Sequence, residues 1–511
     1  MSEAQKAPIS RRNFLKITGL AAVAAQAGGL VAAGVNAGSS SESYTGWESF
    51  NPGTQFFDRT PFQFDGPAHL PVSDVRRPSH VTDYVFGRVA TFQQALSNNP
   101  EWTLDDPVAD LGFPPQLVAF YEEFPERLEW DYKTFTETIP NNAADKRIYG
   151  NYYLLADAYE SGFSAHGRVI PSPSAPPEVY DFAKPSTVTA DNPTGTPLGD
   201  AVPFKTEDLA SEFIKEVAHR YGAALVGITK TNSNWLYDEG WRGCPSDYNF
   251  EEMPAHWEYA VVIGVPMEWD VIIGSPQFST SSDAYDRVTT AAYRLEACLK
   301  FLGYPARAHT PNNGYDLIVP PHAVEAGLGE VGRTGFCITP ELGGNCRMAV
   351  ITTSLPMTID RPIHYGVAEF CQKCKLCAES CPSGAISTAD TSDGMVIRGY
   401  EHWYINNGAC YNYWRETMGP MGCRLCVATC PYSRKDNWLH SLARTVDPRD
   451  PTGLVSSGLL WMQKSFFDAP EAIEYHRPDA GGHFASYRPE PFYMQADRYL
   501  DIEVNSPHGG V

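Results

Sequence analysis

The stretch that decides the fold reads CQKCKLCAESCP and runs from Cys371 to Pro382. Its cysteines follow the spacing C-x2-C-x2-C-x3-C-P, which is typical of bacterial 4Fe–4S ferredoxin motifs. Three cysteines, each separated by two residues, can wrap one face of a cubane cluster, while the fourth reaches away from it. The sequence therefore predicts an iron–sulfur cluster in this segment.

A second motif of the same kind lies downstream and ends at Cys430 and Pro431. Its first cysteine is displaced, so that twelve residues separate Cys410 from Cys423. In two-cluster ferredoxins the last cysteine of each motif binds the other cluster. We therefore expect two ligand sets, which are Cys371, Cys374, Cys377 and Cys430 for the first cluster, and Cys381, Cys410, Cys423 and Cys426 for the second.

Zinc and disulfide bonds are the two alternatives for these cysteines. Structural zinc sites usually pair two C-x-x-C motifs or combine cysteine with histidine. Twelve cysteines in 511 residues are too few for a disulfide scaffold. The observed spacing favours iron–sulfur clusters over both. Of the remaining cysteines, Cys298 fits a helical apolar pattern and is expected in the core.

The composition is that of a folded, acidic protein. Hydrophobic residues make up 43% of the chain and charged residues 20%, which supports a packed core and excludes global disorder. The formal net charge is −22, whereas a nucleic-acid-binding protein normally carries a basic face. We therefore expect no nucleic-acid partner. The length suggests two to four domains.

The first residues form an export signal. Ser10–Lys16 reads SRRNFLK, a twin-arginine motif, and an uncharged run rich in Ala and Gly follows it. Val35–Ala37 provides a small-x-small cleavage site, so residues 1–37 are expected to be a signal peptide. A transmembrane helix is the alternative, but several glycines, Gln26 and Asn36 make the run only weakly hydrophobic.

Four regions follow the signal peptide. They are a loop-rich N-terminal region at 38–204 with short helices near Val89–Leu96 and Pro115–Phe124, a core at 205–365, a cysteine-rich ferredoxin-like domain at 366–435, and a C-terminal extension at 436–511. In the core, apolar spacing predicts helices over Asp208–Tyr221 and Tyr285–Leu302, the latter ending at Gly303. Buried strands are expected over Ala223–Ile228 and Tyr259–Val265. Alternating helices and strands indicate an α/β (α+β) fold.

A glycine motif in the core matches the dinucleotide-binding pattern in letters only. It contains Gly327, Gly329 and Gly332, and Gly335 follows shortly after. A Rossmann loop follows a strand and opens a helix. Here the segment before the motif has a helical pattern and the segment after it is extended, so we expect no nicotinamide nucleotide. The four glycines can instead let the backbone approach a large flat ligand closely.

Together these features resemble the reductive dehalogenase family of cobalamin-dependent enzymes. The matching segments are the twin-arginine leader, Ala326–Gly329, Ile338–Glu341, Gly344–Arg347 and the two cysteine motifs that open at Phe370. The likeness covers residues 205–435 and the leader. It implies a nitroreductase-like core that binds a corrinoid (cobalamin) in the base-off form, beside a ferredoxin-like module with two 4Fe–4S clusters. The chain has no Asp-x-His-x-x-Gly motif, which agrees with the base-off form.

The resemblance also implies the site residues. The family's proton donor is a tyrosine near the start of a core helix, which matches Tyr285, with Tyr293 as the second candidate. Arg347 matches the family's arginine, whose charge would lower the tyrosine pKa from its usual value of ~10. The family's polar contact falls on Asn313 or Asn312, and two extra residues leave both open. The expected corrinoid contacts are Gly327, Gly329, Gly332 and Gly335.

These matches imply an enzyme that reduces a carbon–halogen bond, as in organohalide respiration. The clusters would supply electrons to give Co(I), and attack on carbon, attack on halogen and outward electron transfer all remain open. Trp414 is expected to line the substrate cavity, with core packing as the alternative. The implied partners are a small organohalide, a small integral-membrane anchor protein and a membrane electron donor. The implied location is the outer face of the cytoplasmic membrane, bound peripherally.

Two other functions share some of these sequence features. An epoxyqueuosine reductase shares the cobalamin and cluster layout, but it acts on tRNA in the cytoplasm, which the export signal and the acidic charge oppose. A non-corrinoid electron-transfer protein would use the ferredoxin-like module alone. It would leave more than half of the chain without a role.

Overall fold

The structure is a computed structural model. The residues that it describes are 62–63, 79–138, 140, 200–237, 257–272, 281–311, 315–390, 396–397, 400–413, 423–433, 452–466, 496–500 and 503–504. The expected signal peptide, Asn312, Asn313 and Trp414 lie outside the described residues.

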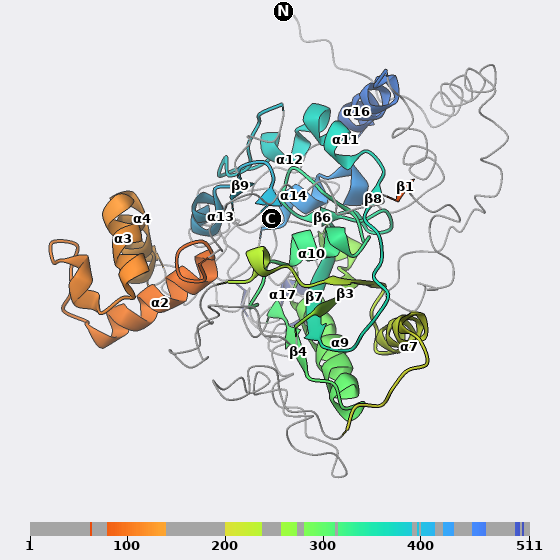
Figure 1. The fold of residues 1–511 in the computed structure, drawn as a ribbon. Coiled ribbons are helices and arrows are strands. Elements are labelled where there is room, and N and C mark those ends of the chain that lie inside the picture. Colours follow the sequence, from red (N-terminus) through yellow and green to blue (C-terminus); the bar gives the residue numbers. More distant parts are fainter. Residues whose placement is uncertain are drawn as a thin grey trace, which may run out of the picture.

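The centre of the fold is a four-stranded antiparallel sheet with the strand order β2-β3-β7-β4 (Figure 1). Its strands are β2 (Leu225–Lys230), β3 (Tyr259–Pro266), β4 (Ala306–His309) and β7 (Cys346–Thr353). Val262 of β3 lies opposite Gly227 on one side and Val350 on the other. All residues of β3 are buried, because helices cover both faces of the sheet.

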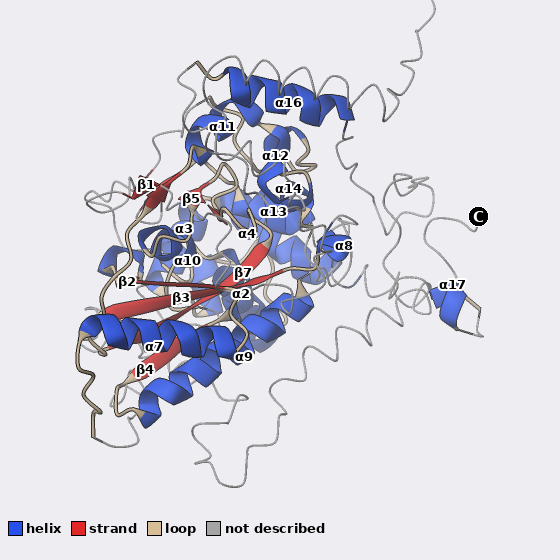
Figure 2. Cartoon of the chain, turned by 90° about the vertical axis from the view of Figure 1, so that its right-hand side faces the viewer, coloured by secondary structure: helices blue, strands red, loops and turns tan. Residues whose placement is uncertain are grey.

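Helices form a layer on each face of the sheet. α7 (Glu207–Arg220) and α9 (Ser282–Phe301) lie side by side on one face, and α10 (Val319–Glu325) packs on the other (Figure 2). Successive residues of β3 point to opposite faces, so that Val261 packs with α7 and α9 and Val262 packs with α10. Burying each such side chain contributes about 1.5–3 kcal/mol, so β3 stabilises the apolar cluster on each face of the sheet.

The core helices and strands predicted from the sequence are present, with ends that differ by up to three residues. α9 begins at Ser282, three residues before the predicted start, and this places Tyr285 in its first turn. The helix stops before Gly303, which has a φ of +81°. A Cβ atom at Gly303 would lie 2.3 Å from the carbonyl oxygen of Asp200, so a side chain has no room. The mixed helix and strand fold is confirmed, and its central sheet is antiparallel.

The N-terminal region contains a helical unit with its own core. It comprises α2 (Val85–Asn98), the 3-10 helix Val108–Leu111, α3 (Pro115–Glu123), α4 (Pro125–Lys133) and the π-helical turn Thr134–Thr138. Sequence analysis expected two short helices in a loop-rich region, so the described part is more helical than expected. A buried ion pair of 2.9 Å joins Arg88 to Asp131, which also accepts a hydrogen bond from Tyr121. This unit forms the orange group in Figure 1.

The cysteine-rich segment folds into short helices beside the core. They are α11 (Val367–Cys374), α12 (Leu376–Glu379), α13 (Asn407–Tyr413), α14 (Leu425–Ala428) and the 3-10 turn Pro431–Ser433. Arg333 of the core holds this segment in place through hydrogen bonds. Its guanidinium donates hydrogen bonds to the carbonyl oxygens of Cys371 (2.7 Å), Ser387 (2.7 Å) and Ala389 (2.8 Å), and it lies 4.8 Å from the ring of Trp403.

The remaining elements are short or peripheral. They are β1 (Phe62–Gln63), the 3-10 turn Ser233–Trp235, α8 (Trp269–Ile272), β5 (Glu330–Val331), β6 (Cys337–Ile338), β8 (Ile363–His364), β9 (Val396–Ile397), β10 (Tyr400–Glu401), α16 (Leu454–Phe466) and α17 (Ala496–Tyr499). α16 packs on α11. Within the described ranges, no helix is both long and apolar enough to cross a membrane.

Candidate active site

Tyr285 lies between two arginines that come from distant parts of the chain. It occupies the first turn of α9. Arg424, which directly precedes α14, donates a hydrogen bond of 2.9 Å from Nη2 to the Tyr285 hydroxyl. The guanidinium carbon of Arg347, on β7, lies 5.0 Å from the centre of the Tyr285 ring. The structure thus brings the predicted Tyr285 and Arg347 together and adds Arg424.

Ser281 holds both arginines in place. Its Oγ accepts a hydrogen bond of 2.9 Å from Nη2 of Arg347 and one of 2.8 Å from Nε of Arg424. Ser281 is the residue before α9, where a serine side chain usually accepts a backbone N–H of the first turn. Its side chain makes no such cap here. The hydroxyl that would stabilise the helix end is used to fix two cations beside Tyr285.

The charges around Tyr285 favour its ionised form. Burial raises the pKa of the Tyr285 phenol, but the guanidiniums of Arg347 and Arg424 outweigh burial and lower that pKa overall. Burial, together with the charge of Arg424, lowers the pKa of Arg347 as well. The Nε of Arg347 is buried and has no hydrogen-bond partner in the described residues. A phenol in this setting can release a proton and leave a stabilised phenolate.

Other tyrosines around Tyr285 have the opposite tendency. Burial and the neighbouring Tyr285 raise the pKa of Tyr315, whose hydroxyl donates to the carbonyl oxygen of Met348 at 3.0 Å. Burial and the neighbouring Tyr237 raise the pKa of Tyr84, and the two rings lie 5.6 Å apart. Tyr285 is therefore the acidic member of a group of phenols.

Tyr293, the second candidate donor, lies two turns further along α9 in a different environment. It is buried, and burial together with the charge of Glu296 raises its pKa to about 12. The nearby cation Arg307 is already paired with Asp316 at 2.7 Å. This setting disfavours proton release from Tyr293.

The eight motif cysteines gather in two groups of thiols. After burial, neighbouring thiols raise the pKa of Cys371, Cys374, Cys377, Cys423 and Cys426, and most of these neighbours belong to the same group, although Cys426 also raises the pKa of Cys377. The first group comprises Cys371, Cys374, Cys377 and Cys430, and the second comprises Cys381, Cys410, Cys423 and Cys426. The assignment of these two groups as cross-over ligand sets stays a prediction. Burial raises the pKa of Cys374 and of Cys426 to about 12, so that a cation is needed to stabilise the thiolates.

The four glycines of the core motif are closely packed. α10 precedes them, and Gly332 and Gly335 lie in the turn of the β5–β6 hairpin, so the order of elements differs from a Rossmann loop as expected. A Cβ atom at Gly327 would lie 2.4 Å from the Arg361 carbonyl oxygen, and one at Gly329 would lie 2.0 Å from that of Ile338. Gly332 and Gly335 likewise approach protein atoms. These contacts explain the glycines by packing, and their contact with a corrinoid stays a prediction.

One described group has the composition of a metal site. Ligand atoms of Glu330, His364 and Glu369 lie within 4.8 Å of one another. Glu330 already accepts hydrogen bonds from His364 (2.8 Å) and from the backbone N–H of Tyr365 (2.7 Å). The Glu330 hydrogen bond raises the pKa of His364, so these residues form an ion-pair network that fixes the turn before α11.

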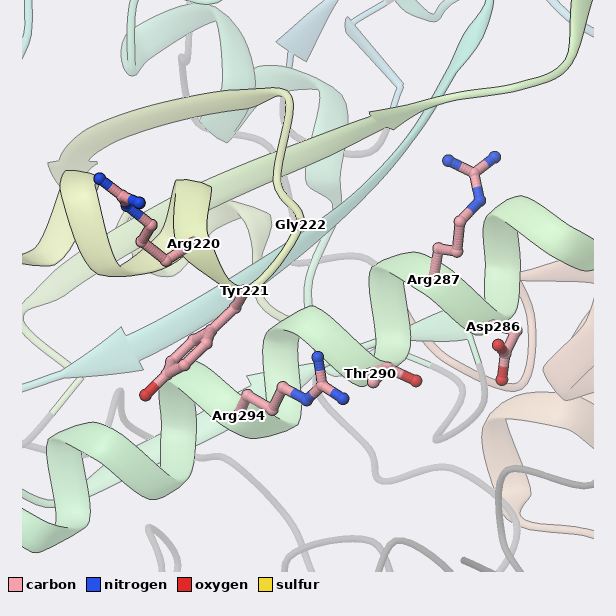
Figure 3. Close-up of a pocket in the computed structure, with 7 residues that line it drawn as sticks. All are labelled: Arg220, Tyr221, Gly222, Asp286, Arg287, Thr290 and Arg294. Atoms are coloured by element: carbon pink, nitrogen blue, oxygen red, sulfur yellow. The ribbon is translucent and has the colours of Figure 1, made fainter. Parts of the chain in front are cut away.

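A surface pocket of about 200 Å³ lies between the end of α7 and the outer side of α9 (Figure 3). Its charged lining consists of Arg220, Asp286, Arg287 and Arg294. Arg287 pairs with Asp283 at 2.5 Å and Arg220 with Glu216 at 2.9 Å. None of the predicted site residues lines this pocket, so it is separate from the site at Tyr285.

Comparisons with known proteins identify relatives of this chain. Residues 370–433 match the family model of the 4Fe-4S dicluster domain. The tetrachloroethene reductive dehalogenase of Sulfurospirillum multivorans is 32% identical over 263 residues, which are 45% of this chain and 51% of that protein. The chain is a relative of the reductive dehalogenases. It spans about half the length of this curated reductive dehalogenase.

A solved reductive dehalogenase supports the fold. It is a catabolic reductive dehalogenase in complex with 3-bromo-4-hydroxybenzoic acid. The matched region is 80% of this chain and 49% of that chain, with a TM-score of 0.53 and 22% identity. At this identity the likeness concerns the fold alone. An epoxyqueuosine reductase of Lactococcus garvieae is 29% identical over a shorter stretch of 128 residues, which are 22% of this chain and 32% of that protein.

Sequence reasoning missed Ser281, Arg424, Tyr84 and Tyr315. The sequence shows Arg424 between two motif cysteines, but it does not show whether its side chain reaches solvent or enters the core. Ser281 precedes the predicted helix and reads as an ordinary cap. Nothing in the sequence connects Tyr84, in the N-terminal region, to the core.

Proposed function

We propose that this chain is a reductive dehalogenase, an oxidoreductase that removes halide from a small organohalide. The observation that carries the proposal is the Tyr285 hydroxyl, which Arg424 holds and Arg347 faces, beside the second group of cysteines. Replacing a halogen by hydrogen consumes two electrons and one proton and releases a halide ion. The reaction therefore needs a proton donor next to an electron supply, and this site joins the two.

The electron supply in this proposal is a pair of 4Fe–4S clusters. We assign Cys371, Cys374, Cys377 and Cys430 to one cluster and Cys381, Cys410, Cys423 and Cys426 to the other. The chemistry of the donors supports the assignment, because several buried thiolates are stable together only with compensating positive charge. The grouping of the thiols in space supports the cross-over ligation.

The acceptor of these electrons would be a base-off corrinoid in a nitroreductase-like core. Tyr285, Tyr315 and Arg347 remain partly exposed, and the unpartnered Nε of Arg347 suits a ligand beside them. When bound, the corrinoid supplies a reduced cobalt centre able to break the carbon–halogen bond. The residues proposed to contact it are Gly327, Gly329, Gly332 and Gly335. Asn313, or Asn312, is the proposed polar contact of the substrate.

The chain's own residues then have defined roles. Tyr285 donates its hydroxyl proton to the substrate carbon as halide leaves. Arg424 and Arg347 stabilise the phenolate that remains, until a proton from solvent restores the hydroxyl. Ser281 accepts a hydrogen bond from each guanidinium and so keeps both cations beside the phenol despite their mutual repulsion. The contribution of such general acid catalysis is typically ~10²–10⁴ in rate.

The location and the partners follow from the leader and the likeness. The proposal includes export by the twin-arginine pathway to the outer face of the cytoplasmic membrane. There the protein would bind peripherally, through a small integral-membrane anchor protein, and receive electrons from a membrane donor. Fractionation of cells into membrane and soluble extracts, with and without the leader, tests this part.

Two alternatives have specific support. The shorter likeness to an epoxyqueuosine reductase favours a cobalamin enzyme that acts on tRNA, but the net charge of −22 opposes binding to a polyanion. The dicluster match alone would also suit a non-corrinoid electron-transfer protein. That alternative does not explain why two arginines lie beside Tyr285.

Metal analysis and a halide-release assay test the proposal. Protein loaded with iron, sulfide and cobalamin should contain about eight iron atoms and about one cobalt atom. With a chemical one-electron donor it should release chloride from tetrachloroethene or another small organohalide. Iron without cobalt would favour the electron-transfer protein. Cobalt without halide release, together with activity on an epoxyqueuosine-containing tRNA stem loop, would favour the second alternative.

A further inference from the structure

The two cysteine motifs place a cation at equivalent positions. The first motif contains Cys374-Lys375-Leu376-Cys377, and the second contains Cys423-Arg424-Leu425-Cys426. Lys375 and Arg424 both adopt the left-handed backbone region, with φ of +53° and +59°, and each directly precedes a four-residue helix. Each carbonyl oxygen accepts backbone hydrogen bonds from the residues three and four positions ahead. The local backbone is thus repeated, so differences between the two cations come from their side chains.

The two side chains go to different places. Lys375 pairs with Asp390 at 2.5 Å, and Asp390 is 86% exposed, so this cation points to solvent. Arg424 is buried and makes hydrogen bonds to Ser281 and Tyr285, both of which belong to the core. Strained left-handed backbone at a non-glycine residue persists only where the surroundings hold it. The hydrogen bonds of Arg424 to Ser281 and Tyr285, in the proposed proton-donor site, help to hold its backbone in this conformation.

Arg424 therefore serves two groups that both favour its charge. It lowers the pKa of the Cys426 thiol in the second cysteine group, and it lowers the pKa of the Tyr285 phenol. A single guanidinium has five N–H donors in a fixed plane, so it cannot move toward one group without weakening its contact with the other. Each group attracts the guanidinium more strongly as it gains negative charge.

We propose that Arg424 is a positioning residue that couples the oxidation state of the second cluster to the proton on Tyr285. This inference rests on the proposed function, because it requires a cluster on Cys381, Cys410, Cys423 and Cys426. An electron on that cluster adds negative charge and draws the guanidinium toward it. The phenol then holds its proton more tightly. When the electron leaves toward the substrate, the guanidinium is again available to the phenolate, and the proton is released more readily.

The other titratable groups described around Tyr285 come from elements outside the cluster-binding motifs. Arg347 approaches from β7, Tyr315 from the segment that precedes α10, and Tyr84 from the segment that precedes α2. Neither phenol has a lowered pKa, because burial raises both. Arg347 lies over the Tyr285 ring and is held by Ser281. Of the charged groups described around Tyr285, Arg424 is the one whose backbone belongs to a cluster-binding motif.

Reductive titration of the loaded protein tests the proposal without measuring turnover. Electron paramagnetic resonance would follow the midpoint potentials of the two clusters at several pH values. In the wild type, the potential of the second cluster should fall as pH rises through the titration of Tyr285. A tenfold difference in the acidity of Tyr285 between the two oxidation states would give a total change of about 59 mV. The potential of the first cluster should not show this step.

Four variants decide the result. Tyr285→Phe removes the proton and should abolish the step while both clusters assemble. Arg424→Gln should abolish it too, and Arg424→Lys should retain a reduced step, which provides a second reading if the glutamine variant loses its cluster. Lys375→Gln is the matched control, since it removes the equivalent cation of the first motif and should leave the step intact.

A step that survives unchanged in Arg424→Gln or in Tyr285→Phe would overturn the proposal, as would loss of the step in Lys375→Gln. The proposed function is judged separately, by cobalt content and halide release. A protein with the step but without halide release would refute dehalogenation and keep the coupling. A protein that releases halide without the step would support dehalogenation and refute the coupling.

Discussion

Arg347 lies over the ring of Tyr285, with 5.0 Å between its guanidinium carbon and the ring centre, and it is Arg424 that bonds the Tyr285 hydroxyl. The two cations therefore act on different parts of one side chain. A cation over a ring face attracts the ring and fixes its orientation. A cation on the hydroxyl stabilises the charge that appears there after proton transfer. Arg347 on β7 thus orients the ring as well as lowering the phenol pKa, and Arg424 adds a direct hydrogen bond from the cysteine-rich segment.

The hydroxyl of Tyr285 should be required for turnover. Tyr285→Phe keeps the ring that Arg347 faces and removes only the donor, so iron and cobalt content should stay at the wild-type level. Halide release should fall by ~10²–10⁴, the usual contribution of a general acid. The control is Tyr293→Phe, which changes a buried phenol on the same helix and should keep most of the activity. Full activity of Tyr285→Phe, with loss in Tyr293→Phe, would move the donor two turns along α9.

The alkaline limit of turnover should depend on Arg347. Tyr285 can donate only while protonated, so halide release should decline as pH rises through its pKa. Arg347 lowers that pKa, and Arg347→Gln should therefore shift the decline to higher pH while reducing the maximal rate. The measurement is kcat against pH in both proteins. Arg294→Gln, an exposed site on the same helix, is the control and should leave the profile in place. A shift toward lower pH in Arg347→Gln would contradict the assigned role.

Cys381 should belong to the second cluster although it lies in the first motif. Cys381→Ala should therefore reduce the signal of the cluster held by Cys423 and Cys426 and leave the other cluster intact. Iron analysis combined with electron paramagnetic resonance of the reduced protein checks this. Cys298→Ala removes a thiol on α9 far from both motifs and should change neither signal. Selective loss of the cluster on Cys371, Cys374 and Cys377 would show that ligation does not cross over.

His322 should make the core sensitive to acid. It is fully buried on α10, where Nδ1 donates to the Ile318 carbonyl oxygen (2.8 Å) and Nε2 accepts from the Asn232 N–H (3.3 Å). Burial lowers its pKa to about 4. Because the folded state binds this proton less well than the unfolded state, the stabilisation is complete above pH ~6.5 and is lost as pH falls toward 4, by about 3 kcal/mol in total.

Urea unfolding at pH 7 and at pH 4 measures this effect. The wild type should lose more stability between the two values than His322→Gln, because glutamine can make both hydrogen bonds without titrating. The difference between the two proteins matters, since other groups titrate equally in both. Equal losses in the two proteins would exclude His322 as the source.

The sequence predicted the parts of the fold that local pattern determines. The run Tyr259–Val265 is apolar throughout and became β3, which helices cover on both faces. The pattern of α7 and α9 gave their extents to within three residues. Alternation of helix and strand does not report strand direction, so the antiparallel sheet came from the structure. The helical unit around Phe92 was underestimated, because α4 has only nine residues and begins directly after α3, so the two do not read as separate helices.

The site was predicted where spacing carries chemistry and missed where it depends on folding. The ferredoxin spacing singled out the eight cysteines as cluster ligands, and likeness to a family singled out Tyr285 and Arg347. Arg424 was passed over because its importance depends on a contact with a residue 139 positions away. No periodicity or motif predicts such a contact. Only the packing of the cysteine-rich segment against α9 creates it.

The place of Arg424 bears on how such proteins can exchange parts. A ferredoxin-like segment is often regarded as an interchangeable unit that evolution or an engineer can graft from one enzyme to another. In this chain the graft would also transplant part of the proposed proton-donor site, because Arg424 belongs to the grafted segment and Tyr285 belongs to the core. A hybrid would assemble with its clusters intact and still lack a matched acid. Successful recombination between relatives must therefore keep the pair Ser281 and Arg424 together.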